Sequence, residues 1–279
     1  DKAIQKFISI TTGYDNREPR NKLIRNAYYW LGEAYYCKGQ LNDAIKSYEV
    51  IISYGSYAEK EIAHYSLGWA LCEKGDRVSF EAAKEQFNLL LTNYPNTEYR
   101  LKTELKQVEI EIEEGNAEKA EKIITELKNS SENVDFLIKN NNLIKQTDFL
   151  FGLLYEKKKD YNKALVFLKK SEDTIDLKLK QKINIQSGLC YKALGDFKKA
   201  IFYFNLASDI SANEKIQVLA KSYLADTYFG RRTNQLDLEI ASKAYEDLIT
   251  QYPNHDLNTE WRKKKASALR QQNQDDEAI

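Results

Sequence analysis

The chain has 279 residues, of which 30% are charged and 12% are aromatic, with 11 glycines and only 3 prolines. This composition favours helices and is too aromatic for a disordered chain. The 42 basic and 42 acidic residues cancel to a formal net charge of zero. Nucleic acid and anionic membranes attract proteins with a strong positive field, so neither is expected as a partner, and proteins are favoured instead.

Residues 27–52 predict two amphipathic helices joined by a tight turn at Lys38-Gly39-Gln40. One face of each helix carries small and large apolar residues at helical spacing: Leu31, Gly32 and Tyr35 in the first, and Ala44, Tyr48 and Ile51 in the second. A single pair of this kind cannot bury its own apolar stripe. We therefore expect the pattern to recur along the chain.

The pattern recurs in four further registers, which begin at Leu67-Gly68, Phe151-Gly152, Gly188 and Leu224-Ala225. Together with the first, these registers resemble the tetratricopeptide repeat (TPR), a helix-turn-helix unit of about 34 residues. The resemblance implies an all-α fold, a right-handed superhelical solenoid. It also implies about six full repeats, with partial repeats at both ends.

We expect one array over residues 1–279. In chain order it comprises a partial leading helix and loop (1–20), front repeats (21–127), an irregular connection (128–144), back repeats (145–258) and a terminal polar helix (259–279). The front repeats include a degenerate one at 98–127. Extra residues at 77–79 are expected to lie between the helices of the second repeat, and residues 230–236 to widen a later turn. The sequence contains no methionine, which indicates a processed or excised piece from which a targeting segment can be missing.

Motifs for catalysis and metal binding are absent from the sequence. The two histidines, His64 and His255, are distant in the chain, and no phosphate-binding glycine loop or nucleophile elbow occurs. Cys37, Cys72 and Cys190 lack metal-ligand spacing, and each lies in a predicted first helix, so buried reduced thiols are expected. We therefore expect a non-enzymatic protein without catalytic residues, metal or cofactor. An enzyme whose site has no recognisable motif is the competing hypothesis.

In the family that the chain resembles, the first helices of the repeats line a concave groove. The resemblance places these partner-binding candidates at groove-facing positions: Tyr29, Trp30, Glu33, Tyr36, Tyr65, Trp69, Phe149, Tyr223 and Asp226, with Asn26, Leu153 and Phe229 beside them. Exposed aromatic rings bury a large area at low entropic cost, so the front residues are suited to anchor a partner. The alternative is that several of these rings pack between adjacent first helices.

The groove residues also restrict the kind of partner. Family members that grip a C-terminal carboxylate use Lys and Asn, whereas Tyr29 and Glu33 occupy two of those positions here. An extended or helical peptide with apolar side chains is therefore expected.

Two phrases, AHYSLGWALCEKGD and FNLLLTNYPNTEYR, and the Tyr-Pro repeat endings resemble the bacterial cell-envelope branch of the family. The resemblance implies a protein-protein interaction scaffold in an envelope-associated assembly, in the periplasm or at a membrane rather than in the cytoplasm. The alternative is a purely structural component of a large membrane-anchored machine, such as a flagellar motor accessory. Such a component would be joined through array ends or convex faces.

Overall fold

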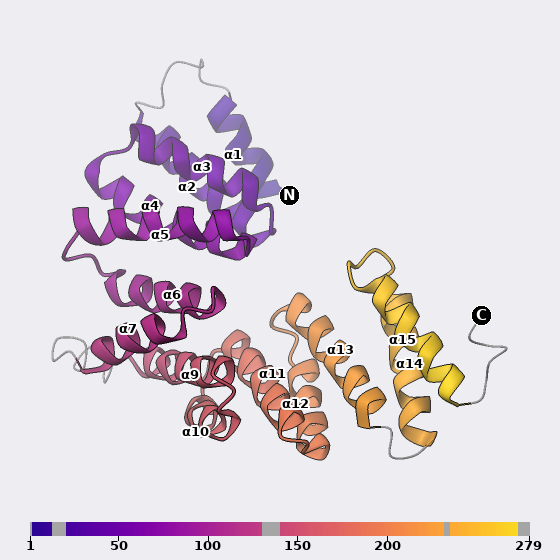
Figure 1. The fold of residues 1–279 in the computed structure, drawn as a ribbon. Coiled ribbons are helices and arrows are strands. Elements are labelled where there is room, and N and C mark those ends of the chain that lie inside the picture. The colour runs from indigo at the N-terminus through magenta and orange to yellow at the C-terminus, as the bar shows by residue number, and fades with distance from the viewer. Residues whose placement is uncertain (1, 13–20, 130–139, 232–234, 273–279) are drawn as a thin grey trace. The chain divides into compact units, whose positions relative to one another are not determined.

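The computed structural model describes residues 2–12, 21–129, 140–231 and 235–272 (Figure 1). Within these ranges the chain forms 14 α-helices and no strand, which confirms the predicted all-α class. Contacts between Cα atoms divide the chain into two compact units, residues 1–123 and 124–279. A single array over the whole chain stays a prediction.

Unit 1 is a succession of helices, the first six of which pack in chain order, each on the one before it (Figure 1). Its helices are α1 (Lys2–Thr12), α2 (Lys22–Cys37), α3 (Leu41–Tyr54), α4 (Tyr57–Lys74), α5 (Arg77–Asn93), α6 (Arg100–Glu113) and the start of α7 (Ala117–Asn129). Residues 98–127, predicted as a degenerate repeat, hold α6 and most of α7, and their grouping as one repeat stays a prediction. Glu111 stands where the repeat pattern expects a tyrosine. It is buried and accepts hydrogen bonds from Lys119 of α7 and from Asn116 of the preceding turn.

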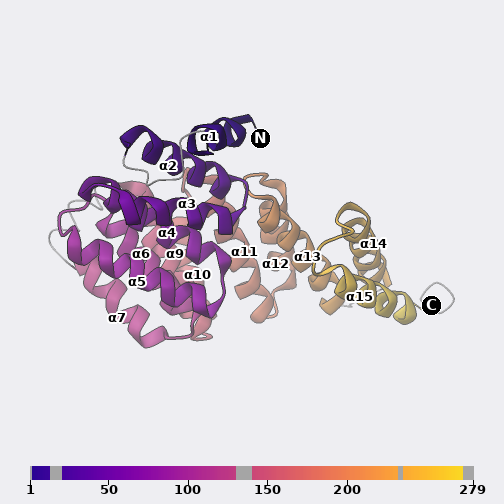
Figure 2. The ribbon, with the colours of Figure 1, turned by 90° about the horizontal axis from the view of Figure 1, so that it is seen from above.

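Unit 2 continues the same alternation of first and second helices. It contains α9 (Asn141–Lys157), α10 (Tyr161–Ser171), α11 (Leu177–Ala193), α12 (Phe197–Asp209), α13 (Glu214–Arg231), α14 (Gln235–Gln251) and α15 (Asn258–Gln271). The first helices α9, α11 and α13 also pack on one another, and Figure 2 shows their succession from a second side. The described residues thus hold six helix pairs, with α1 and α15 unpaired at the ends, as predicted for six full and two partial repeats.

The turn inside a repeat combines a left-handed residue with a polar N-cap. Gly75 has φ +73° after α4, and Asp76 then accepts a hydrogen bond from the backbone of Ser79 at 2.9 Å. Only glycine adopts this conformation without steric cost. Lys159 adopts it nevertheless, with φ +61°, before the N-cap Asp160. The helix-turn-helix register is therefore set by short signals in the sequence.

Several sequence expectations need correction. Residues 77–79 are not a loop insertion, because the Asp76 cap starts α5 at Arg77. Residues 230 and 231 belong to α13, and α14 begins at Gln235, so the described parts of 230–236 are helical. Cys37 is exposed at the end of α2 rather than buried, whereas Cys72 and Cys190 are buried. Most of the predicted irregular connection, residues 130–139, lies outside the described residues.

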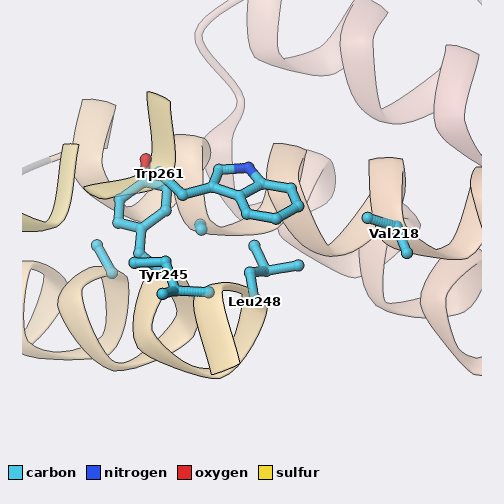
Figure 3. Packing of buried hydrophobic residues seen from close by; sticks show 7 residues of the cluster. Val218, Tyr245, Leu248 and Trp261 are labelled. Atoms are coloured by element: carbon cyan, nitrogen blue, oxygen red, sulfur yellow. The ribbon is translucent and has the colours of Figure 1, made fainter. Parts of the chain in front are cut away.

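The last described helix packs closely despite its polar composition. Trp261 of α15 is fully buried in a cluster with Tyr245 and Leu248 of α14 and Val218 of α13 (Figure 3). Its indole Nε1 donates a hydrogen bond to Ser222 Oγ at 2.9 Å. The helix predicted to be polar therefore packs one of its faces against the core of unit 2.

Candidate partner-binding site

Four of the predicted residues meet in one pocket of unit 1, which we call the aromatic pocket. Glu33 and Tyr36 come from α2, and Tyr65 and Trp69 come from α4. Each pair is three or four residues apart, so both side chains lie on the same face of their helix. Tyr48 of α3 and Ser66 of α4 complete a pocket of about 190 Å³.

Neutral hydroxyl groups hold the Glu33 carboxylate, among them those of Tyr48 and Ser66. Tyr48 Oη donates to Glu33 Oε1 at 2.8 Å, and Ser66 Oγ donates to the same oxygen at 3.2 Å. Burial raises the pKa of Tyr48 far above its usual value, and the hydrogen bond to Glu33 raises this pKa further. Tyr48 therefore stays protonated and holds the carboxylate in place.

Aromatic rings line the remaining wall of the pocket. Tyr65 and Trp69 have ring centroids 5.9 Å apart, and Tyr65 also stacks on Tyr99 at 4.5 Å. Burial raises the pKa of Tyr65 to about 12. Lys106 Nζ lies 4.5 Å from the Trp69 ring and is held by Glu109 Oε2 at 2.7 Å. The pocket thus combines a carboxylate with neutral, preorganised aromatic groups.

Tyr29 and Trp30 lie beside this pocket rather than in its lining. Their rings meet edge to face with centroids 5.3 Å apart, and Tyr29 reaches Tyr48 at 6.3 Å. Trp30 remains 55% exposed. The front of unit 1 therefore offers one exposed indole next to a partly buried aromatic cluster.

The predicted residues of unit 2 do not form a comparable pocket. Phe149 is only 4% exposed and Leu153 only 5%. Both are therefore buried, whereas a groove position was expected to be exposed. Tyr223 packs against Phe204 with centroids 5.5 Å apart. Asp226 accepts from Tyr245 Oη at 2.6 Å, and both its oxygens lie 2.9 Å from Lys264 Nζ. These side chains therefore pack or bond with other residues of unit 2.

Tyr48 and Ser66 were missed by the sequence reasoning, although a signal for Tyr48 exists. Where the second helix carries a tyrosine, as at Tyr48 and Tyr245, an acid follows the small residue of the first helix. Where it carries phenylalanine, the residue after the small one is apolar, as at Trp69 and Leu189. This pairing follows from the need of a buried hydroxyl for an acceptor. Ser66 has no comparable signal.

The two tyrosine-acid pairs allow a matched test of stability. Tyr48→Phe is expected to lower the free energy of unfolding by about 1–3 kcal/mol, because Glu33 loses its shorter hydrogen bond inside the repeat. Tyr245→Phe is expected to cost less, since Asp226 keeps Lys264 as a partner. Urea denaturation followed by circular dichroism measures both. A larger loss for Tyr245→Phe would contradict this ranking.

Within the described ranges, no three His, Cys, Asp or Glu side chains gather closely enough to hold a metal ion. Burial raises the pKa of the Cys72 and Cys190 thiols to about 12, which keeps both protonated. His64 Nδ1 lies 2.8 Å from Gln86 Oε1, in the packed interior of unit 1. None of the described helices is long and apolar enough to cross a membrane.

Comparisons with known proteins agree with the helix-turn-helix repeats of the structure. Two models of the tetratricopeptide repeat match residues 26–54 and 181–214. The first match covers most of α2 and all of α3, and the second covers most of α11 and all of α12. No curated protein matches the chain in sequence.

Three solved structures share the fold at low sequence identity. The APC/C hetero-tetramer Cut9–Hcn1 has a TM-score of 0.67 at 14% identity, over 95% of this chain and 46% of that chain. The Pseudomonas aeruginosa pilF protein has a TM-score of 0.51 at 17% identity, over 85% and 96%. A signal transduction ATPase from Pyrococcus horikoshii with a tetratricopeptide repeat sensor has 0.52 at 15%, over 91% and 44%. The chain thus spans less than half of the Cut9–Hcn1 chain that it matches. Two of its segments match tetratricopeptide repeats, and its described residues have the all-α fold of consecutively packed helices that these structures share.

Proposed function

We propose that the chain is a non-enzymatic scaffold that docks a segment of a partner protein on the first-helix face of unit 1. One observation carries the proposal: Glu33, Tyr36, Tyr65 and Trp69, which the family resemblance places at groove-facing positions, converge on one pocket. Tetratricopeptide repeats use extended surfaces built from neighbouring repeats to bind proteins. Aromatic side chains in such a surface are the residues that most often dominate binding energy.

The proposal also includes the cellular location of the scaffold. The repeat endings Tyr94-Pro95 and Tyr252-Pro253 support an envelope-associated assembly in bacteria, in the periplasm or at a membrane. Zero net charge supports recognition by shape and local contacts over long-range electrostatic steering.

Replacing Trp69 or Trp30 with alanine tests the docking surface. Each substitution is expected to weaken binding of a captured partner by about 2 kcal/mol, roughly 30-fold, if that indole is a binding hot spot. Trp30 is exposed, so its removal leaves the packing of unit 1 nearly unchanged. The measurement is a pull-down with the native chain, followed by affinity measurement for each partner identified.

Tyr54→Ala is the matched control, because Tyr54 is a 46% exposed aromatic residue on the second helix α3, outside the aromatic pocket. Circular dichroism must show the same helix content for all three variants. If both tryptophan variants stay folded and keep every partner at native affinity, docking at this face is wrong.

A purely structural role is the second candidate. It is favoured by exposed apolar side chains on second helices of unit 2, among them Val166 and Phe202. Val166 and Leu194 also line a surface depression of about 470 Å³. In this case Val166→Glu would abolish assembly, whereas Trp30→Ala and Trp69→Ala would leave it intact.

A further inference from the structure

We propose that the aromatic pocket takes the cationic head of a Lys or Arg side chain carried by the partner segment. This inference rests on the proposed function, because it assigns the chemistry of the docked residue. The cation would meet the Glu33 carboxylate at the floor and the rings of Tyr36, Tyr65 and Trp69 on the wall.

The first argument is the charge of Glu33. Its neighbours are neutral hydroxyl groups: Tyr48 and Ser66 donate hydrogen bonds to it, and the side chain of Tyr29 also interacts with it. Among the residues that the structure describes, no lysine or arginine forms an ion pair with this carboxylate, and Lys106, beside Trp69, is buried and bonded to Glu109. A partly buried carboxylate without a cation is stabilised by an opposite charge that arrives with a ligand.

The second argument is a comparison within the chain. Asp226 occupies the same place as Glu33, directly after the small residue of a first helix, and also accepts from the tyrosine of the second helix. In unit 2 the following first helix, α15, supplies Lys264 to this acid. In unit 1 the following first helix, α4, supplies the neutral Ser66 hydroxyl to Glu33. The repeat geometry therefore provides a cation position that is filled internally in unit 2 and left to a ligand in unit 1.

The third argument is the shape and polarity of the wall. Aromatic faces attract ammonium and guanidinium groups within about 6 Å of the ring centre. Trp69 already shows this preference, since Lys106 Nζ lies 4.5 Å from its ring. The pocket has a volume of about 190 Å³, which exceeds the space that a single water molecule needs and admits the end of a Lys or Arg side chain.

The same features disfavour other occupants. An anionic residue would be repelled by Glu33, and an apolar residue would remove water from the carboxylate without replacing its hydrogen bonds. The partner segment is therefore expected to place one cationic side chain among apolar neighbours.

Small amides of single amino acids test the pocket without knowledge of the partner. The probes are the N-acetyl methylamides of lysine, arginine and norleucine, the last being the neutral analogue of lysine. Binding is followed by two-dimensional amide NMR of the 279-residue chain. The lysine or arginine amide is expected to shift signals of residues 33–36 and 65–69 and to bind at least about tenfold more tightly than the norleucine amide.

Glu33→Gln removes the charge and keeps an oxygen that can accept from Tyr48. It is expected to abolish the preference for the cationic amides over norleucine. Asp226→Asn is the matched control and is expected to leave the preference unchanged, because Asp226 already binds Lys264. If norleucine binds as tightly as the cationic amides, or if Glu33→Gln keeps the preference, the inference is wrong.

The outcome is separable from the proposed function. A partner lost on Trp69→Ala but retained at native affinity by Glu33→Gln would leave docking in place and exclude the cation. Cationic amides that shift the pocket signals, together with partners indifferent to Trp30→Ala and Trp69→Ala, would support the cation site and exclude docking of the partner there.

Discussion

Trp261→Ala is expected to lower the free energy of unfolding of unit 2 by about 3–5 kcal/mol, the range for a large aromatic residue removed from a core. Trp261 is fully buried and packs with Tyr245 and Leu248 of the preceding helix. The substitution leaves a cavity between α14 and α15 and removes the hydrogen bond to Ser222. It also removes the stacked contact with His255, whose ring centroid lies 4.9 Å away.

Urea denaturation followed by far-ultraviolet circular dichroism measures this loss. Trp30→Ala is the matched control, since it deletes the same side chain from an exposed position on α2. Its expected effect on stability is within about 0.5 kcal/mol. Equal unfolding midpoints for the two variants would mean that α15 contributes little to unit 2.

The register of the helices could be predicted from the sequence because the small residues of first helices recur against large residues of second helices. Gly32 meets Tyr48 in this way, and Gly188 meets Phe204. The burial of Trp261 is harder to predict, because the sequence of α15 is rich in charged residues and its buried face consists of few side chains. Composition averages over a helix, whereas packing depends on the single face that meets a neighbour.

The candidate site was predictable only in part. Counting positions along the first helices located Glu33, Tyr36, Tyr65 and Trp69, which do converge. The same count selected Phe149 and Asp226, which the structure uses internally. Whether a predicted residue stays available depends on side chains from other helices, such as Lys264, which binds Asp226. A repeat pattern within one helix does not show which side chains of other helices reach a given position.

Gly68→Ala is expected to destabilise unit 1 by about 1–3 kcal/mol, the cost of overpacking a well-filled core. A Cβ atom at Gly68 would lie 2.2 Å from Cε1 of Phe87 and 2.7 Å from its Cδ1. The Phe87 ring is fully buried and packs in a cluster with Cys72 and Ile110. It cannot withdraw without opening the contacts between α4, α5 and α6.

Gly230→Ala is the matched control for the same substitution in a helix. Gly230 is the penultimate residue of α13, and nothing lies within 4 Å of the Cβ position. Alanine there is expected to be neutral or to stabilise by up to about 1 kcal/mol, because glycine is the poorer helix former. The urea midpoint of Gly68→Ala should therefore fall below the native value, whereas the midpoint of Gly230→Ala should stay at the native value or rise above it. A Gly68→Ala midpoint at or above the native value would show that the α4–α5 interface yields to an added methyl group, and that glycine is not required for this contact.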